Sequence, residues 1–185
     1  LDEKGRNYIQ YIKDASTRLS EQIKALLEHS RIGRHGDKSL VNIKEVVEVV
    51  KYDLGKRIKD TNAKVNAGSL PKIMGYEVEL RLLFQNLISN AIKYTPRDRN
   101  PDVRIASYRE GAHWVFSVTD NGYGISEEDK KNIFTIFNRV KETDANEGTG
   151  VGLAHVEKIV QLHEGTIWVE SQVDVGSTFY FKLKA

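Results

Sequence analysis

Two asparagines, Asn86 and Asn90, interrupt an otherwise apolar stretch of the chain between Leu82 and Tyr94. At helical spacing they lie one turn apart on the same face, which Lys93 and Tyr94 extend by another turn. Amide groups on the inward face of a helix are costly to bury unless something bonds to them. Because a neutral amide oxygen beside an ammonium group suits a metal ion and phosphates, the pattern predicts a polar ligand site on this helix.

Composition limits the classes of protein to consider. The 185 residues are 39% apolar and 29% charged, which is ordinary for one soluble domain with an appendage. The absence of cysteine excludes a disulfide framework and a thiolate metal site, and a net charge of +2 is too weak to favour nucleic acid. The apolar runs are far shorter than a membrane span, and no secretory signal is visible. Because the chain starts in mid-pattern at Leu1, we expect a fragment of a longer protein.

The N-terminal part, residues 1–34, is predicted to form one helix with an apolar seam. Such a seam is typical of packing against other helices. We favour a partner helix outside this chain, and the alternative is that the helix lies on the rest of the chain. Residues 35–38 are polar and contain glycine, as expected of a linker. The seam consists of Ile9, Ile12, Ser16, Leu19, Ile23, Leu26 and Ser30.

Residues 39–185 are predicted to form a second domain. The order of expected helices and strands favours an α/β two-layer sandwich, a mixed sheet covered by helices on one face. Asn42 and Glu45 resemble a capping box at the start of a core-facing helix that runs to Ile58. The other expected elements are strands at 64–66 and 72–74, the asparagine helix at 76–94, strands at 103–108 and 114–120, a helix at 151–163 capped by Gly165, and a closing hairpin of 166–171 with 178–183.

A carboxylate ends the apolar face of the strand at 114–120. Asp120 continues the alternation of Phe116 and Val118, so it should be part-buried and in need of hydrogen-bond donors. Gly122 and Gly124 follow, and they allow the backbone to turn and to approach a ligand. The carboxylate could accept a bond from the exocyclic amine of adenine, or the motif could be a tight turn with an aspartate cap.

A glycine-rich stretch precedes the last helix. Gly148, Gly150 and Gly152 free several backbone N–H groups for an anion, although the spacing matches neither a P-loop nor the dinucleotide fingerprint. The alternative is a flexible hinge. Upstream, Arg139 could add positive charge near a triphosphate, and the polar residues 141–146 are typical of a mobile lid.

Aromatic and histidine residues add less. Phe134 and Phe137 suit a short amphipathic turn that packs on the domain or on a partner. The five histidines are scattered without ligand spacing. We expect His155 and His163, eight residues apart on one helix, to be surface or packing residues rather than metal ligands.

Four stretches in fixed order resemble the GHKL ATPase superfamily, most closely the catalytic ATP-binding domain of sensor histidine kinases. They are the asparagine helix, residues 120–124, the Phe134–Arg139 segment and residues 148–153, and the final Gly176-Ser177-Thr178-Phe179 is similar to the family's closing motif. The resemblance covers about residues 39–185. It implies a Bergerat-type ATP-binding fold preceded by the long N-terminal helix, with ATP and Mg²⁺ as cofactors.

The resemblance also implies roles for individual residues. Asn90 matches the magnesium ligand, with Asn86 lining the same site, and Asn90 and Lys93 are the residues implied for catalysis. Asp120 matches the carboxylate that reads adenine, and Thr178 matches a position near it. The complete set placed around nucleotide and metal is Asn86, Asn90, Lys93, Tyr94, Asp120, Gly122, Gly124, Ile125, Arg139, Gly148, Thr149, Gly150, Val151, Gly152, Leu153 and Thr178.

Residues 26–34 resemble the end of the second helix of the histidine-kinase dimerisation domain. No histidine here has the context of the family's phosphate acceptor, so we expect that residue to lie outside the fragment. The resemblance implies a homodimer in the full protein, a response-regulator receiver domain as partner in a two-component phosphorelay, and no nucleic acid. It implies a cytoplasmic location, with any membrane attachment through regions outside this chain.

Three alternative functions remain open. ATP-hydrolysing relatives of the gyrase, mismatch-repair and heat-shock-chaperone type carry a water-activating glutamate where this chain has Asn86, and an amide cannot take a proton near neutral pH. A serine kinase of the anti-sigma or mitochondrial dehydrogenase-kinase type is disfavoured by the dimerisation-like helix. A signalling pseudokinase would bind nucleotide without transferring phosphate.

Overall fold

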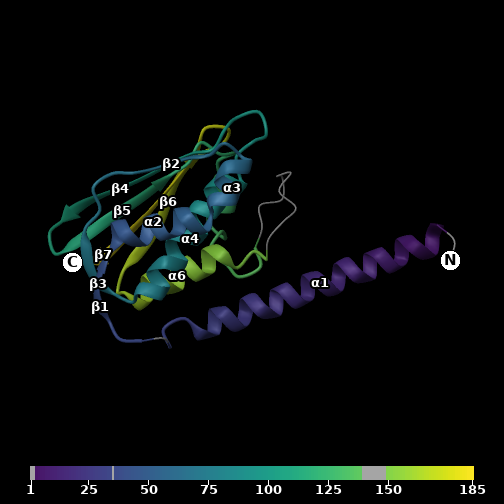
Figure 1. Cartoon of the computed structure of the whole chain (residues 1–185), viewed down its shortest axis with the longest axis horizontal. Coiled ribbons are helices and arrows are strands. Elements are labelled where there is room, and N and C mark those ends of the chain that lie inside the picture. The colour runs from purple at the N-terminus through teal and green to yellow at the C-terminus, as the bar shows by residue number, and fades with distance from the viewer. Residues whose placement is uncertain (1–2, 35, 139–148) are drawn as a thin grey trace.

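A long helix and a layered α/β body make up the computed structural model, which describes residues 3–34, 36–138 and 149–185. Helix α1 (Glu3–Arg31) extends away from the body and approaches it near its C-terminal end (Figure 1). No helix in these three ranges is both long enough and apolar enough to cross a membrane.

The body is a two-layer sandwich, as predicted. Its five-stranded sheet has the order β2-β4-β5-β7-β6, in which β2 and β4 run parallel and the other neighbours run antiparallel. Helices α2, α4 and α6 lie over one face of this sheet (Figure 1). The strands are β2 (Lys64–Ala67), β4 (Asp102–Glu110), β5 (His113–Thr119), β6 (Thr166–Gln172) and β7 (Gly176–Lys184), and a separate ribbon pairs β1 (Ser39–Asn42) with β3 (Lys72–Gly75). The helices of the body are α2 (Ile43–Asp53), α3 (Gly55–Asp60), α4 (Glu77–Lys93), α5 (Glu127–Lys130) and α6 (Gly152–Leu162).

Three phenylalanines form the centre of the layer between sheet and helices. Phe116 of β5 and Phe181 of β7 stack with ring centroids 5.0 Å apart, and Phe84 of α4 meets Phe181 edge to face at 5.6 Å. All three side chains are fully buried. Since alternate residues of a strand share a face, this packing also fixes the side of the sheet toward which Asp120 points.

The predicted helix start at Asn42 is confirmed. Asn42 Oδ1 accepts from the Lys44 backbone N–H at 3.2 Å. The Glu45 carboxylate accepts from the Asn42 side-chain amide at 2.7 Å, whereas in a capping box it would accept from the Asn42 backbone N–H. The single helix predicted to run to Ile58 is wrong, because α2 ends at Asp53 and α3 begins at Gly55. Glycine is a poor helix former, which accounts for the break.

The end of α6 also differs in detail from the prediction. Glu164, with φ of 57°, takes the left-handed position expected of Gly165. Gly165 serves close packing instead, because a Cβ there would lie 2.3 Å from the carbonyl oxygen of Lys182.

His155 and His163 are packing residues, each 4% exposed. His163 Nδ1 donates to the Ile159 carbonyl at 2.8 Å, and its Nε2 accepts from the Tyr76 backbone N–H at 3.0 Å. Burial and, less strongly, Lys38 lower the pKa of His163 below its ordinary value. The neutral imidazole therefore joins the end of α6 to the start of α4.

Stability should fall in mild acid because of this histidine. A lowered folded-state pKa gives a contribution that is complete above the ordinary value of about 6.5 and is lost as pH falls below it. Urea unfolding at pH 8 and pH 5.5 should show a smaller pH dependence for His163→Gln than for the unchanged chain. His113→Gln, at the start of β5, is the matched control, and an equal pH dependence in His163→Gln would contradict the assignment.

The N-terminal helix was expected either to pack against a partner helix or to lie on the rest of the chain, and the structure has features of both. Its last turns lie on the body, where the His155 ring donates to the Ala25 carbonyl at 3.3 Å and stacks on His29 with centroids 5.4 Å apart. Farther from the body the seam is open, with Ile12 69% exposed and Leu19 59% exposed. A partner for that exposed seam stays a prediction.

Candidate nucleotide-binding site

A cavity opens between α4, the start of α6, the end of β5 and the start of β7. Its walls are mostly apolar, and a few polar groups converge on it, as in most small-molecule sites. Among the residues predicted for the site, six line this cavity: Asn90, Tyr94, Asp120, Gly124, Ile125 and Leu153. The lining also contains six residues outside the predicted set: Ala91, Tyr123, Ile133, Asn138, Ser177 and Phe179.

Asp120 provides the carboxylate of the cavity. Its Oδ1 accepts from the backbone N–H groups of Gly122 at 2.8 Å and Ser177 at 3.2 Å. Burial raises the pKa of the Asp120 carboxyl above its ordinary value, and these two backbone bonds oppose the shift. Because the bonds given to this side chain by the described residues fall on Oδ1, Oδ2 is available to a ligand that donates a hydrogen bond.

The loop after Asp120 packs closely against two neighbouring segments. A Cβ on Gly122 would lie 2.6 Å from the Tyr94 carbonyl oxygen, and one on Gly124 would lie 2.1 Å from that of Gln172. Both positions therefore require glycine. The loop is held between the end of α4 and the β6–β7 turn, and this close packing fixes the position of the cavity wall.

The polar face of α4 divides between two hollows. Asn90 and Tyr94 line the cavity, whereas Lys93 lines an adjacent basic groove. The Lys93 ammonium donates to the Tyr94 hydroxyl at 3.0 Å and lies 4.4 Å from the centroid of that ring. The structure therefore brings two of these three residues to the cavity and holds the third beside it.

Asn86 faces the start of α6. Its amide nitrogen donates to the Leu82 carbonyl at 2.9 Å, and its Oδ1 would lie 2.8 Å from a Cβ placed on Gly152. Asn86 lines a cleft between α1 and α6 together with Thr149, Val151 and Gly152. Asn86 and Asn90 thus share a face of α4 but line different hollows.

The oxygen atoms that line the cavity fit a magnesium ion that is held mainly by the phosphates of a bound ligand and by water. Within residues 3–34, 36–138 and 149–185, no cluster of three His, Cys, Asp or Glu side chains could hold a metal. Asn90 can supply an amide oxygen, a hard donor of the kind that Mg²⁺ prefers. Magnesium commonly keeps several waters and binds substrate phosphates, so a single protein oxygen is compatible with it.

The glycine-rich stretch enters α6 beside the cavity. Gly150 has a φ of 72°, and its carbonyl accepts from Phe137 N at 2.9 Å. Val151 precedes the helix as a buried residue. Phe134 packs at the edge of the core, whereas Phe137 is 44% exposed. The predicted site residues Arg139 and Gly148, and the lid proposed for 141–146, lie outside the described residues.

Thr178 does not reach the cavity, contrary to the position implied by the resemblance. Its hydroxyl lies 3.1 Å from that of Thr119, and Ser177 lines the cavity instead. Along β7, Ser177, Phe179 and Phe181 are buried and share one face, so Thr178 points to the other. The alternation of the two phenylalanines was the sequence signal that could have identified Ser177.

The geometry agrees with what the chain resembles in sequence. A family model described as "Histidine kinase-, DNA gyrase B-, and HSP90-like ATPase" matches residues 75–185, the segment that contains the whole cavity lining. The chain belongs to this family of ATPases. The resemblance to the GHKL superfamily is therefore confirmed.

Members of the family that resemble the chain include sensor kinases. "Phytochrome-like protein Cph1" of Synechocystis sp. is 35% identical over 184 residues, which are 99% of this chain and 24% of that protein. "Sensor-like histidine kinase SenX3" of Mycobacterium bovis is 33% identical over 189 residues, 97% of this chain and 45% of that protein. The structure of histidine kinase ThkA in complex with response regulator protein TrrA matches with a TM-score of 0.70 and 26% identity, covering all of this chain and 53% of that one. The chain thus spans about a quarter to a half of these relatives.

Proposed function

We propose that this chain is the ATP-binding catalytic part of a sensor histidine kinase and transfers the γ-phosphoryl group of ATP to a histidine outside residues 1–185. The observation that carries the proposal is the free Oδ2 of Asp120 at the end of an apolar cavity, with Asn90 in the same lining. A carboxylate against an apolar wall suits the exocyclic amine of adenine, and the amide oxygen suits magnesium on the phosphates.

The residues of the chain position the nucleotide rather than carry out covalent chemistry. Magnesium, when bound, would neutralise charge on the phosphates, and Asn90 on α4 would supply an amide oxygen to hold it. Tyr94 of the α4 end and Leu153 of α6 both supply parts of the cavity wall. Backbone N–H groups at the start of α6 can face the phosphates. Lys93, next to Tyr94 in sequence, could bind a phosphate that extends from the cavity into the groove.

Hydrolysis of ATP is a weaker second candidate. Asn86 occupies the position at which hydrolysing relatives are expected to carry a glutamate, and its amide nitrogen is bound to the Leu82 carbonyl. An amide in this arrangement cannot accept a proton from water. Nucleotide held in the cavity is therefore suited to transfer rather than to rapid hydrolysis.

We extend the proposal to the longer protein. Residues 1–34 would be the second helix of a dimerisation and phosphoacceptor hairpin, residues 35–38 a linker and residues 39–185 the catalytic domain. The exposed seam of α1 supports a helical partner and a homodimer. The complex of ThkA with a response regulator supports a receiver domain as the next acceptor, and the use of ATP supports a cytoplasmic location.

Trans-phosphorylation tests the proposal. The chain, incubated with radiolabelled MgATP and a helical hairpin that carries the acceptor histidine of the same protein, should yield label on the hairpin. Phosphohistidine should be labile in acid and stable in alkali. Bound nucleotide without transfer would favour a pseudokinase, and an acid-stable label would favour a serine kinase.

A further inference from the structure

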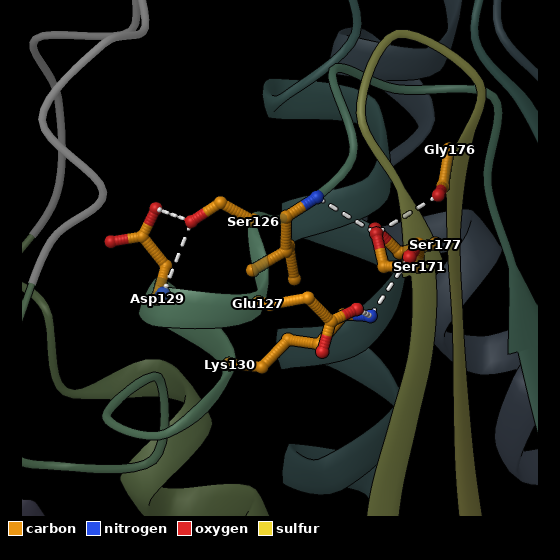
Figure 2. A network of polar contacts seen from close by, with 8 residues as sticks. Ser126, Glu127, Asp129, Lys130, Ser171, Gly176 and Ser177 are labelled. Atoms are coloured by element: carbon orange, nitrogen blue, oxygen red, sulfur yellow. Dashed lines mark hydrogen bonds and ion pairs between the residues drawn. The ribbon is translucent and has the colours of Figure 1, made fainter.

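Ser171, near the end of β6, is the centre of a network of polar contacts (Figure 2). Its hydroxyl accepts from the Ile125 backbone N–H at 2.8 Å. The same oxygen lies 3.0 Å from the Gly176 carbonyl oxygen and 2.9 Å from the Ser177 hydroxyl. Ile125 and Ser177 both line the cavity, so one side chain contacts two parts of its wall.

The hydrogen positions in this network follow from counting donors. A hydroxyl has one proton and two lone pairs, and a carbonyl can only accept. Ser171 must therefore donate its proton to Gly176, and it receives one from the Ile125 backbone. The remaining contact requires the Ser177 hydroxyl to donate to Ser171. The proton of Ser177 thus points toward Ser171, and the lone pairs of its oxygen remain for the cavity.

The orientation matters because Ser177 adjoins the carboxylate of the site. The backbone N–H of Ser177 donates to Asp120 Oδ1 at 3.2 Å, and the backbone N–H of Asp120 donates to the Ser177 carbonyl at 2.8 Å. Asp120 and Ser177 therefore present only acceptors at this end of the cavity. A purine with a 6-amino group can donate to such a pair directly or through water, whereas a 6-oxo group would meet lone pairs without a proton.

We propose that Ser171 is a positioning residue that fixes the proton of the Ser177 hydroxyl and thereby makes the cavity select a 6-amino purine over a 6-oxo purine. The inference rests on the proposed nucleotide site. It assigns part of the base selectivity to a residue that touches the wall of the cavity and not the base.

The backbone of Ser171 is also held in place. Lys130 Nζ donates to the Ser171 carbonyl at 2.9 Å and pairs with Glu127 at 2.6 Å (Figure 2). Ser126, at the start of the same short helix, accepts from Asp129 N at 3.1 Å and caps it. Because α5 anchors β6 at this point, the backbone that carries the Ser171 hydroxyl is held in place.

The test compares ATP with inosine triphosphate, in which a 6-oxo group replaces the 6-amino group. In the unchanged chain the dissociation constant of inosine triphosphate should exceed that of ATP. The ratio of the first to the second, measured by titration calorimetry, should be about threefold to tenfold smaller in Ser171→Ala. The freed Ser177 hydroxyl can then rotate and donate to a 6-oxo group. Ser177→Ala removes the oriented acceptor itself and should lower the ratio similarly, and the double variant should lower it no further.

The control is Ser107→Ala, which also removes a hydroxyl bonded to a backbone carbonyl on the sheet, 3.0 Å from Ser69 O, away from the cavity. A purely structural role for Ser171 would weaken both nucleotides equally and leave the ratio unchanged, which would overturn the proposal. If Ser171→Ala does not fold, Ser177→Ala decides, and an unchanged ratio there is equally fatal. Failure of the unchanged chain to bind ATP would instead refute the proposed function.

Discussion

Asn90→Ala is expected to abolish the dependence of ATP affinity on Mg²⁺. Asn90 lines the cavity with an amide oxygen suited to the ion, and its removal takes that protein ligand away from the metal. The unchanged chain should bind ATP at least about tenfold more weakly in EDTA than in Mg²⁺, whereas the variant should bind equally in both. Titration calorimetry in the two buffers measures this difference.

Two further variants make the result specific. Asn66→Ala, an exposed position on β2, should behave as the unchanged chain. Asn86→Ala should have a smaller effect than Asn90→Ala, because Asn86 faces Gly152 in the neighbouring cleft. A Mg²⁺ dependence that survives in Asn90→Ala would rule out Asn90 as the ligand.

Asp120→Asn is expected to weaken ATP binding by about 10-fold to 100-fold. The change removes a charge-assisted hydrogen bond worth roughly 1.5–3 kcal/mol. In the unchanged chain, affinity should also fall in acid, because protonation takes away the acceptor. Since burial raises the pKa of Asp120, this loss should begin at a higher pH than for an ordinary aspartate. Titrations from pH 8 to pH 4.5 measure both effects.

The pH dependence separates Asp120 from acid damage elsewhere. Asp120→Asn should bind weakly over the whole range and lose the part of the acid decline that belongs to the carboxylate, because its amide does not titrate there. Asp53→Asn, at an exposed ion pair with Arg81, should keep both the affinity and the decline. Unchanged affinity in Asp120→Asn would mean that the carboxylate does not contact the base.

Periodicity was sufficient to predict the parts of the site that lie on regular elements. The two-residue repeat of β5 predicted that Asp120 shares the face of Phe116 and Val118, and the helical repeat of α4 predicted a polar face that carries Asn90. Both residues line the cavity. The same two-residue repeat applied to β7 places Ser177 on the cavity face with Phe179, whereas the motif match had assigned the neighbouring Thr178 to the site. Here the geometry of the strand was the more reliable guide.

The remaining differences arise where tertiary contacts decide. Lys93 has a long, flexible side chain, so its helix position did not determine that it would bind the Tyr94 hydroxyl beside the cavity. The network around Ser171 depends on segments 46 residues apart in sequence, Ile125 and Ser171, that meet only in the fold. Such contacts have no local pattern that a single sequence could reveal.

The position of the nucleotide can be measured directly by ¹H–¹⁵N spectra of the assigned chain titrated with a non-hydrolysable ATP analogue and Mg²⁺. The cavity should place the largest shift changes on the backbone amides of Gly122 and Ser177, which donate to Asp120, and of Ile125 in the cavity lining. The same titration of Asp120→Asn should need a correspondingly higher concentration. Changes confined to Asn62, Arg97 and Arg99 in the basic groove would contradict the assignment of the cavity as the ATP site.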